Sequence, residues 1–203
     1  ITDWRRLWGQ GDFPFYFVQL ASYLPLADNT LKGSTWAELR DAQRQALALP
    51  HTGMAVAIDI GDANDIHPRN KQEVGRRLAL LALNRDCGKP QRDSAPVLRS
   101  VSPQGKNLVL GFDPAGGLAV RGGGELRGFA VAGAKGGFHL AQARIDGQHV
   151  VLSSPAVPRP VAARYGWVDN PEQASLTALD GLPVGPFRTD QAPLLSERGR
   201  FTP

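Results

Sequence analysis

The stretch that decides the fold reads MAVAIDIGDANDIHPRNKQEVGRRLAL and covers residues 54–80. It begins with Met54–Ile60, a short apolar run with β-branched residues, which predicts a strand covered on both faces. A polar loop follows. Asn70 then stands three residues before Glu73, which is the spacing of a helix N-cap. We expect the buried face of this helix to consist of Val74, Leu78, Leu81 and Ala82.

A similar unit precedes this stretch. Pro14–Ala21 (PFYFVQLA) is another short apolar and aromatic run, and a loop around Asp28 and Asn29 follows it. Thr35 stands three residues before Glu38, which predicts a second helix that ends before Pro50. Its apolar stripe consists of Trp36, Leu39, Ala42, Ala46 and Leu47. The order strand, helix, strand, loop, helix predicts two parallel strands joined by a right-handed crossover.

The composition changes near residue 88. More than half of the 23 glycines lie between Gly88 and Gly147, where short apolar runs alternate with turn residues. Close spacing of this kind predicts an antiparallel β-sandwich. The expected strands are Val97–Val101, Asn107–Phe112, Leu118–Val120, Leu126–Ala132, His139–Ile145, His149–Ser153 and Val161–Trp167. We therefore expect an α/β part at 1–87, a β-sandwich at 88–180 and a Pro-rich tail at 181–203 that wraps the surface.

The overall composition excludes several classes of protein. The chain has 203 residues, 42% hydrophobic and 21% charged, which is typical of a globular protein and not of a disordered tail or a coiled coil. No apolar run approaches the roughly 20 residues of a membrane span. The net charge is +4, but the basic residues are scattered, so we expect no nucleic-acid partner. Cys87 is the single cysteine and cannot form an internal disulfide.

His67 is the candidate catalytic residue. It follows the strand predicted at Met54–Ile60, and ligands of open α/β sheets bind beyond the carboxyl ends of the strands. Carboxylates stand two, five and eight residues before it, at Asp65, Asp62 and Asp59. A carboxylate beside an imidazole fixes its tautomer and makes it a general base. Two other interpretations stay open, a solvated surface histidine and a cation site made by His67 with the three aspartates. We expect the other histidines, His51, His139 and His149, to be structural.

Longer stretches carry a family resemblance. DWRRLWGQGDFPFYFVQLA (3–21), WAELRDAQ (36–43) and TGMAVAIDIGDANDIHPRNKQEVGRRLAL (52–80) resemble the sialate O-acetylesterase family of the SGNH hydrolases. LRGFAVAG (126–133), ARYGWVDNP (163–171) and GLPVGPFRTD (181–190) resemble the β-rich region that follows in that family. The resemblance implies an α/β fold: the C-terminal part of a flavodoxin-like SGNH α/β/α sandwich, followed by an antiparallel β-sandwich domain.

The activity that the resemblance implies is removal of O-acetyl groups from sugars by acyl transfer, with no cofactor and no metal. A serine attacks the acetyl carbonyl, and His67 matches the family's general base. The family's usual carboxylate lies three residues before the histidine, where this chain has Asn64. We expect Asp65, two residues before, to orient the ring instead; Asn64 or a Ser–His dyad remains an alternative.

The family's Gly-Gln-Ser-Asn and Gly-Glu-Ser-Asn motifs do not occur in these 203 residues. The resemblance therefore implies that the serine nucleophile lies on an N-terminal segment of the same enzyme, and that this chain, which begins at Ile1, is its C-terminal piece. We expect the two pieces to stay bound, since two strands and two helices do not bury both faces of a parallel sheet. Relatives in the family are commonly exported, so the resemblance implies a periplasmic or secreted protein.

Other residues have two interpretations. Gln19 is expected either to line the acetyl-sugar pocket or to bond the backbone at the end of its strand. Trp36 either stacks on a sugar or packs in the core. We expect Arg164, Tyr165, Trp167 and Asp169 to lie between the two halves.

The acetylated substrate, sialic acid or a hemicellulose or other glycan ester, is not decided by the sequence. A different function also stays open, that of a non-catalytic carbohydrate-binding β-sandwich fragment.

Overall fold

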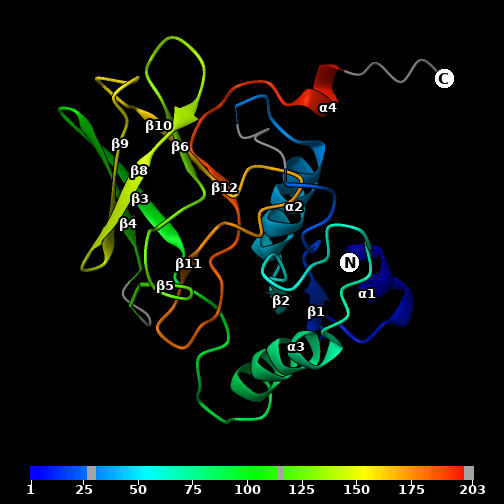
Figure 1. Cartoon of the computed structure of the whole chain (residues 1–203). Coiled ribbons are helices and arrows are strands. Elements are labelled where there is room, and N and C mark those ends of the chain that lie inside the picture. Colours follow the sequence, from blue (N-terminus) through cyan, green and yellow to red (C-terminus); the bar gives the residue numbers. More distant parts are fainter. Residues whose placement is uncertain (27–30, 114–116, 199–203) are drawn as a thin grey trace.

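The computed structural model describes residues 1–26, 31–113 and 117–198. The expected loop residues Asp28 and Asn29, and the end of the expected tail at 199–203, lie outside the described residues. Helices and a parallel pair of strands make up the N-terminal part, and antiparallel sheets make up the C-terminal part (Figure 1). The protein is therefore a mixed α/β structure.

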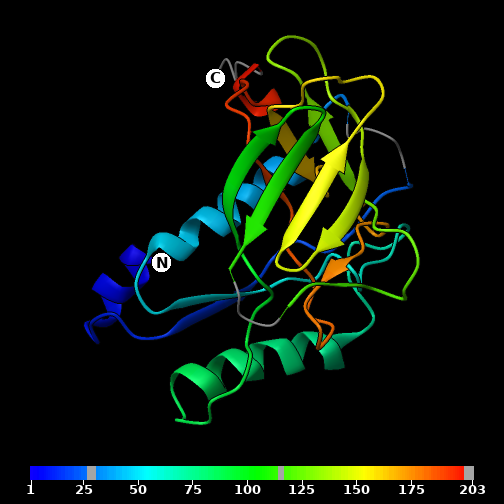
Figure 2. The same ribbon diagram turned by 90° about the vertical axis from the view of Figure 1, so that its left-hand side faces the viewer.

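The N-terminal part confirms the predicted order of elements. It contains α1 (Thr2–Trp8), β1 (Phe15–Val18), α2 (Thr35–Gln45), the 3₁₀ helix η1 (Ala46–Ala48), β2 (Thr52–Ala55) and α3 (Lys71–Arg85). β1 and β2 are parallel, with Phe15 opposite Thr52 and Val18 opposite Ala55. The segments after both strands therefore leave the sheet at the same edge (Figure 2). α1 is an additional helix that the sequence analysis did not predict.

β2 is shorter than expected and ends at Ala55 instead of Ile60. The chain turns after it, and the amide of Ile60 donates to the carbonyl of Ala57. This turn inserts Ile58, which is fully buried, into the hydrophobic core of the β part. The run Met54–Ile60 therefore contributes to two cores. Its first residues are buried in β2, and Ile58 is buried in the core of the β part.

The helix caps and buried faces differ in part from the predictions. The Asn70 cap is confirmed, with Oδ1 accepting from the amide of Glu73 at 3.1 Å. The cap of α2 is Ser34 instead of Thr35, and its Oγ accepts from the amide of Ala37 at 3.0 Å. The predicted apolar stripe of α2 was wrong as a buried face, because the helix buries Ala37, Glu38, Arg40 and Asp41 while Leu39 is exposed. In α3, Leu81 is buried as predicted, together with Arg77.

The C-terminal part contains two four-stranded antiparallel sheets, ordered β3-β4-β9-β8 and β12-β10-β6-β7, and a small pair β11-β5. Its elements are β3 (Leu98–Gln104), β4 (Asn107–Phe112), β5 (Ala119–Val120), β6 (Phe129–Ala132), β7 (His139–Leu140), β8 (Gln142–Asp146), β9 (His149–Ser153), β10 (Ala162–Tyr165), β11 (Leu176–Thr177), β12 (Phe187–Arg188) and α4 (Leu195–Arg198). The run expected as one strand at His139–Ile145 divides into β7 and β8. β12, in the expected tail, pairs with β10.

Buried side chains of both sheets form one hydrophobic cluster, which is the packing expected of an antiparallel sandwich. Leu110 and Leu152 belong to β4 and β9, while Phe129 and Tyr165 belong to β6 and β10. The rings of Phe129 and Tyr165 lie 4.6 Å apart between centroids. No helix in the described part of the chain is long and apolar enough to cross a membrane.

Arg40 joins the two parts of the molecule. Its side chain is fully buried, and its guanidinium donates to four backbone carbonyls. Two of them, at Leu20 and Ala21, follow β1, and the other two, at Val168 and Asp169, follow β10. The carboxylate of Asp169 also accepts from the Ser34 hydroxyl at 2.5 Å. The expected position between the two halves is thereby confirmed for Asp169, but it was wrong for Tyr165, which lies in the hydrophobic core of the β part, and for Arg164, which pairs with Asp190.

Candidate active site

The loop between β2 and α3 carries the two predicted catalytic residues, His67 and Asp65, and Arg77 fixes its base. The buried Arg77 guanidinium donates to both carboxylate oxygens of Asp59 at 2.7 Å, and to the carbonyl of Val56. It also donates to Glu73 at 2.8 Å. Hydrogen bonds from Arg76 and then from Arg77 lower the pKa of Glu73 to about 2, so this carboxylate is ionised at neutral pH. The start of the loop is thus attached to α3.

The same loop packs closely against the segment that follows β1. The hydroxyl of Ser22 donates to the carbonyl of Ile58, and Ser22 is buried. A Cβ atom added to Gly61 would lie 2.1 Å from the backbone oxygen of Ser22, which is far inside van der Waals contact. Position 61 therefore requires glycine because of this close approach.

We expect Gly61→Ala to displace the loop and to lower both stability and any activity that depends on His67. Gly75→Ala is a matched control, since Gly75 lies in α3 with no atom within 4 Å of an added Cβ. That change should stabilise the helix by about 0.5–1 kcal/mol. Urea unfolding of both variants measures the effect. Equal stability of Gly61→Ala and the parent would show that the loop is not held in this way.

His67 and Asp65 form a pair at the far end of the loop. His67 Nδ1 lies 3.2 Å from Asp65 Oδ1, which also accepts from the His67 amide at 2.9 Å. These bonds from His67, first from the amide and then from the ring, lower the pKa of Asp65. The His67 side chain is 81% exposed. With Nδ1 held by the carboxylate, Nε2 is the nitrogen that remains for proton transfer.

Two alternatives for this loop were an orienting role for Asn64 and a cation site made by His67 with the three aspartates. The amide of Asn64 donates to Asp62 Oδ1 at 2.9 Å, and the contacts of the described residues join Asn64 to no atom of His67. Asp59 is occupied by Arg77, so the three aspartates and His67 do not converge on one point. Within residues 1–26, 31–113 and 117–198, no group of three or more His, Cys, Asp or Glu side chains is placed to hold a metal ion.

The two predicted substrate-binding residues occupy different environments. Gln19 is buried, and its Nε2 donates to the carbonyl of Arg40 at 3.0 Å, which corresponds to the backbone-bonding interpretation. Its Oε1 has no hydrogen-bond partner among the described residues. Trp36 is half-buried, with its ring edge-on to Tyr23 at 5.5 Å between centroids. Trp36 is therefore partly accessible to solvent, and Gln19 is not.

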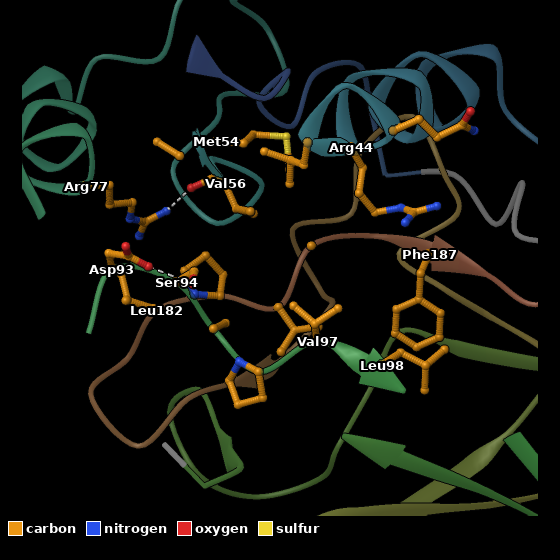
Figure 3. A pocket seen from close by; sticks show the side chains of 18 of the residues that line it. Arg44, Met54, Val56, Arg77, Asp93, Ser94, Val97, Leu98, Leu182 and Phe187 are labelled. Carbon is orange, nitrogen blue, oxygen red and sulfur yellow. Dashed lines mark hydrogen bonds between the residues drawn. The ribbon is translucent and has the colours of Figure 1, made fainter. Parts of the chain in front are cut away.

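A cavity of about 800 Å³ lies along β2, between the two parts of the molecule (Figure 3). Met54, Val56, Val97 and Phe187 give it apolar walls, and Arg77 lies at its border. Neither His67 nor Asp65 lines it. The sequence analysis missed both this cavity and the role of Arg77, for which the spacing of Glu73 and Arg77 on one helix face was the available signal.

Known acetylesterases are similar to this chain. No family model matches the chain. Residues of the chain are 41% identical to mouse sialate O-acetylesterase over 102 residues, and 36% identical to the human enzyme of that name over 96 residues. Each match covers 40% of this chain and 18% of the relative. The resemblance to sialate O-acetylesterases is thus confirmed as partial homology.

A solved structure extends the comparison over more of the chain. A carbohydrate acetylesterase from Xanthomonas citri is 50% identical and superimposes with a TM-score of 0.88. The match covers 94% of this chain and 44% of that one. The chain therefore spans less than half of this structural neighbour, and about a fifth of the mouse and human relatives.

Proposed function

We propose that this chain is the C-terminal part of a carbohydrate O-acetylesterase of the SGNH type, with His67 as the general base. The observation that carries the proposal is the His67–Asp65 pair, on a loop that leaves the carboxyl edge of a parallel sheet. Ligands of such sheets bind at this edge. The partial homology with sialate O-acetylesterases and the similarity to a carbohydrate acetylesterase support the assignment of ester chemistry.

The proposed reaction proceeds in two steps. A serine Oγ attacks the acetyl carbonyl while His67 Nε2 accepts the hydroxyl proton, and the protonated imidazole then gives this proton to the departing sugar oxygen. Water next attacks the acetyl-serine, His67 accepts the water proton, and acetate leaves as the proton returns to the serine. Asp65 stabilises the imidazolium in both steps through Nδ1.

We assign the serine to an N-terminal segment of the same enzyme. Ser22, the serine that closes the loop after β1, is unsuited to the role because it is buried and donates to the Ile58 carbonyl. All four residues of β1, Phe15–Val18, are half-buried, and Trp4 of α1, which is more than half exposed, lies beside Phe15. A further parallel strand on the free edge of β1 would cover this aromatic surface. We further propose, from the resemblance, that the enzyme is periplasmic or secreted.

The proposed substrate is an acetylated sugar, either a sialic acid or a neutral glycan ester such as that of hemicellulose. Trp36 with Tyr23 offers an aromatic surface of the kind that stacks on a sugar ring. Gln19 is not assigned to the substrate, since its amide is buried against Arg40.

A serine-directed phosphonate inhibitor tests this function on the full-length protein. We expect the protein to release acetate from acetylated sugars, the inhibitor to abolish this release, and mass spectrometry to place the label outside residues 1–203. A label on a serine of these residues would contradict the assignment of the nucleophile. Binding of sugar without any release of acetate would favour the alternative, a non-catalytic carbohydrate-binding fragment.

A further inference from the structure

A second pocket lies at the other end of the molecule from α3, where the loop between β6 and β7 meets the segment before β10 (Figure 1). Its volume is about 340 Å³, and it is lined by Lys135, Gly136, Gly137, His139 and Arg159, among others. Hydrogen bonds fix its base: the amide of Val161 donates to the carbonyl of Ala132 at 2.8 Å, and β7 pairs with β6. The pocket is therefore formed by two segments that the sheet holds side by side.

The ionisable residues that line this pocket are all basic. Lys135, Arg159 and, when protonated, His139 are cationic, and neither 132–140 nor 155–162 contains an Asp or Glu. Arg159 differs from every other arginine whose side chain the structure describes, because its guanidinium makes no ion pair and no hydrogen bond there. The others pair with carboxylates, as Arg144 does with Asp146, or donate to carbonyls, as Arg40 and Arg121 do.

The glycines of the loop add neutral donors. Gly136 has a φ of +106°, a conformation that favours glycine. Within the described residues, the amides of Gly136 and Gly137 donate to no acceptor. Unpaired backbone amides beside cationic side chains are typical of anion-binding loops. The free guanidinium supplies the planar fork that binds two oxygens of a carboxylate or sulfate.

We propose that this pocket binds the anionic group, a carboxylate or a sulfate, of an acidic glycan, with Arg159 and Lys135 as its main ligands. A volume near the lower limit for ligand pockets suits one acidic sugar residue. The choice of a glycan rests on the proposed function, whereas the choice of an anion rests on the charges and free donors of the pocket. The pocket contains no residue of the His67 loop, so it would be a second contact point for an acidic polymer.

The test measures binding of the full-length protein to polygalacturonate and a sialylated oligosaccharide as carboxylate probes, to dextran sulfate as the sulfate probe, and to neutral dextran. We expect Lys135→Ala/Arg159→Ala to weaken binding to a carboxylate or sulfate probe at least about tenfold. Lys106→Ala/Arg144→Ala is the matched control, since it removes the same charge from exposed residues elsewhere on the sheets. It should change binding less than about twofold.

The probes identify the anion, and the variants test the site. Binding to the carboxylate probes alone, or to dextran sulfate alone, would support the proposal and name the group. Equal losses in both double variants, or binding to neutral dextran as tight as to the acidic glycans, would overturn it. Hydrolysis of a small neutral aryl acetate is measured in parallel and should be unchanged by the pocket variant. Absence of hydrolysis with intact glycan binding would count against the proposed function alone.

Discussion

Replacing His67 by alanine in the full-length enzyme is expected to lower kcat/KM for acetyl ester hydrolysis by about 10²–10⁴-fold, the usual contribution of a general base. The loss follows from the proposed mechanism, in which His67 is the group that accepts the serine proton. The His67 side chain is 81% exposed, so its removal leaves no cavity, and stability should stay close to that of the parent. Steady-state hydrolysis of an aryl acetate and of an acetylated sugar measures the effect.

The control for this variant is His149→Ala, which removes an exposed histidine from β9. It should retain full activity.

Two further variants distinguish the groups that could orient the ring. Asp65→Asn should lower kcat, because an amide does not offset the imidazolium charge, whereas Asn64→Ala should have little effect. Hydrolysis by His67→Ala within threefold of the parent would contradict the role of His67. A larger loss in Asn64→Ala than in Asp65→Asn would transfer the orienting role to Asn64.

Periodicity was sufficient for the order of elements from β1 to α3, because short apolar runs and cap spacing are local signals. The strands at Asn107–Phe112 and His149–Ser153 were placed at their observed bounds for the same reason. β12 escaped prediction because two residues carry no periodicity of their own, and Phe187–Arg188 become a strand only through pairing with β10.

The candidate site was predictable only in part. His67 and Asp65 lie two residues apart, so their pairing follows from the local turn. The anchors of the loop do not follow from local sequence. Arg77 meets Asp59 across 18 positions, and Gly61 meets Ser22 across the sheet. The buried face of α2 was mispredicted because Arg40, a residue usually exposed, is satisfied by four carbonyls that only the folded chain brings together.

The same four carbonyls make Arg40→Met the substitution with the largest expected effect on stability. Burial lowers the pKa of the Arg40 guanidinium to about 10, so the group is still charged at neutral pH and donates to all four carbonyls. Methionine fills a similar volume but donates nothing. Each buried carbonyl left without a donor costs about 1–3 kcal/mol. The total is a large fraction of the roughly 5–15 kcal/mol that stabilises a typical domain.

We therefore expect Arg40→Met to lower the free energy of unfolding by at least about 4 kcal/mol, or to prevent folding. Arg40→Lys keeps the charge but reaches fewer of the carbonyls, so it should fold with an intermediate loss. The control is Arg44→Met, one turn further along α2, where the guanidinium is partly exposed and pairs with Asp41. It should cost less than about 1 kcal/mol.

Urea unfolding of the three variants separates these expectations. Arg40 joins the segment after β1 to residues 168–169, so its loss should also loosen the edge of the sheet at which Ser22 supports the His67 loop. Activity of Arg40→Lys should accordingly fall more steeply with temperature than that of the parent. Stability of Arg40→Met within 1 kcal/mol of the parent would show that the four carbonyls find other donors, and that the two parts are held together by their apolar contacts alone.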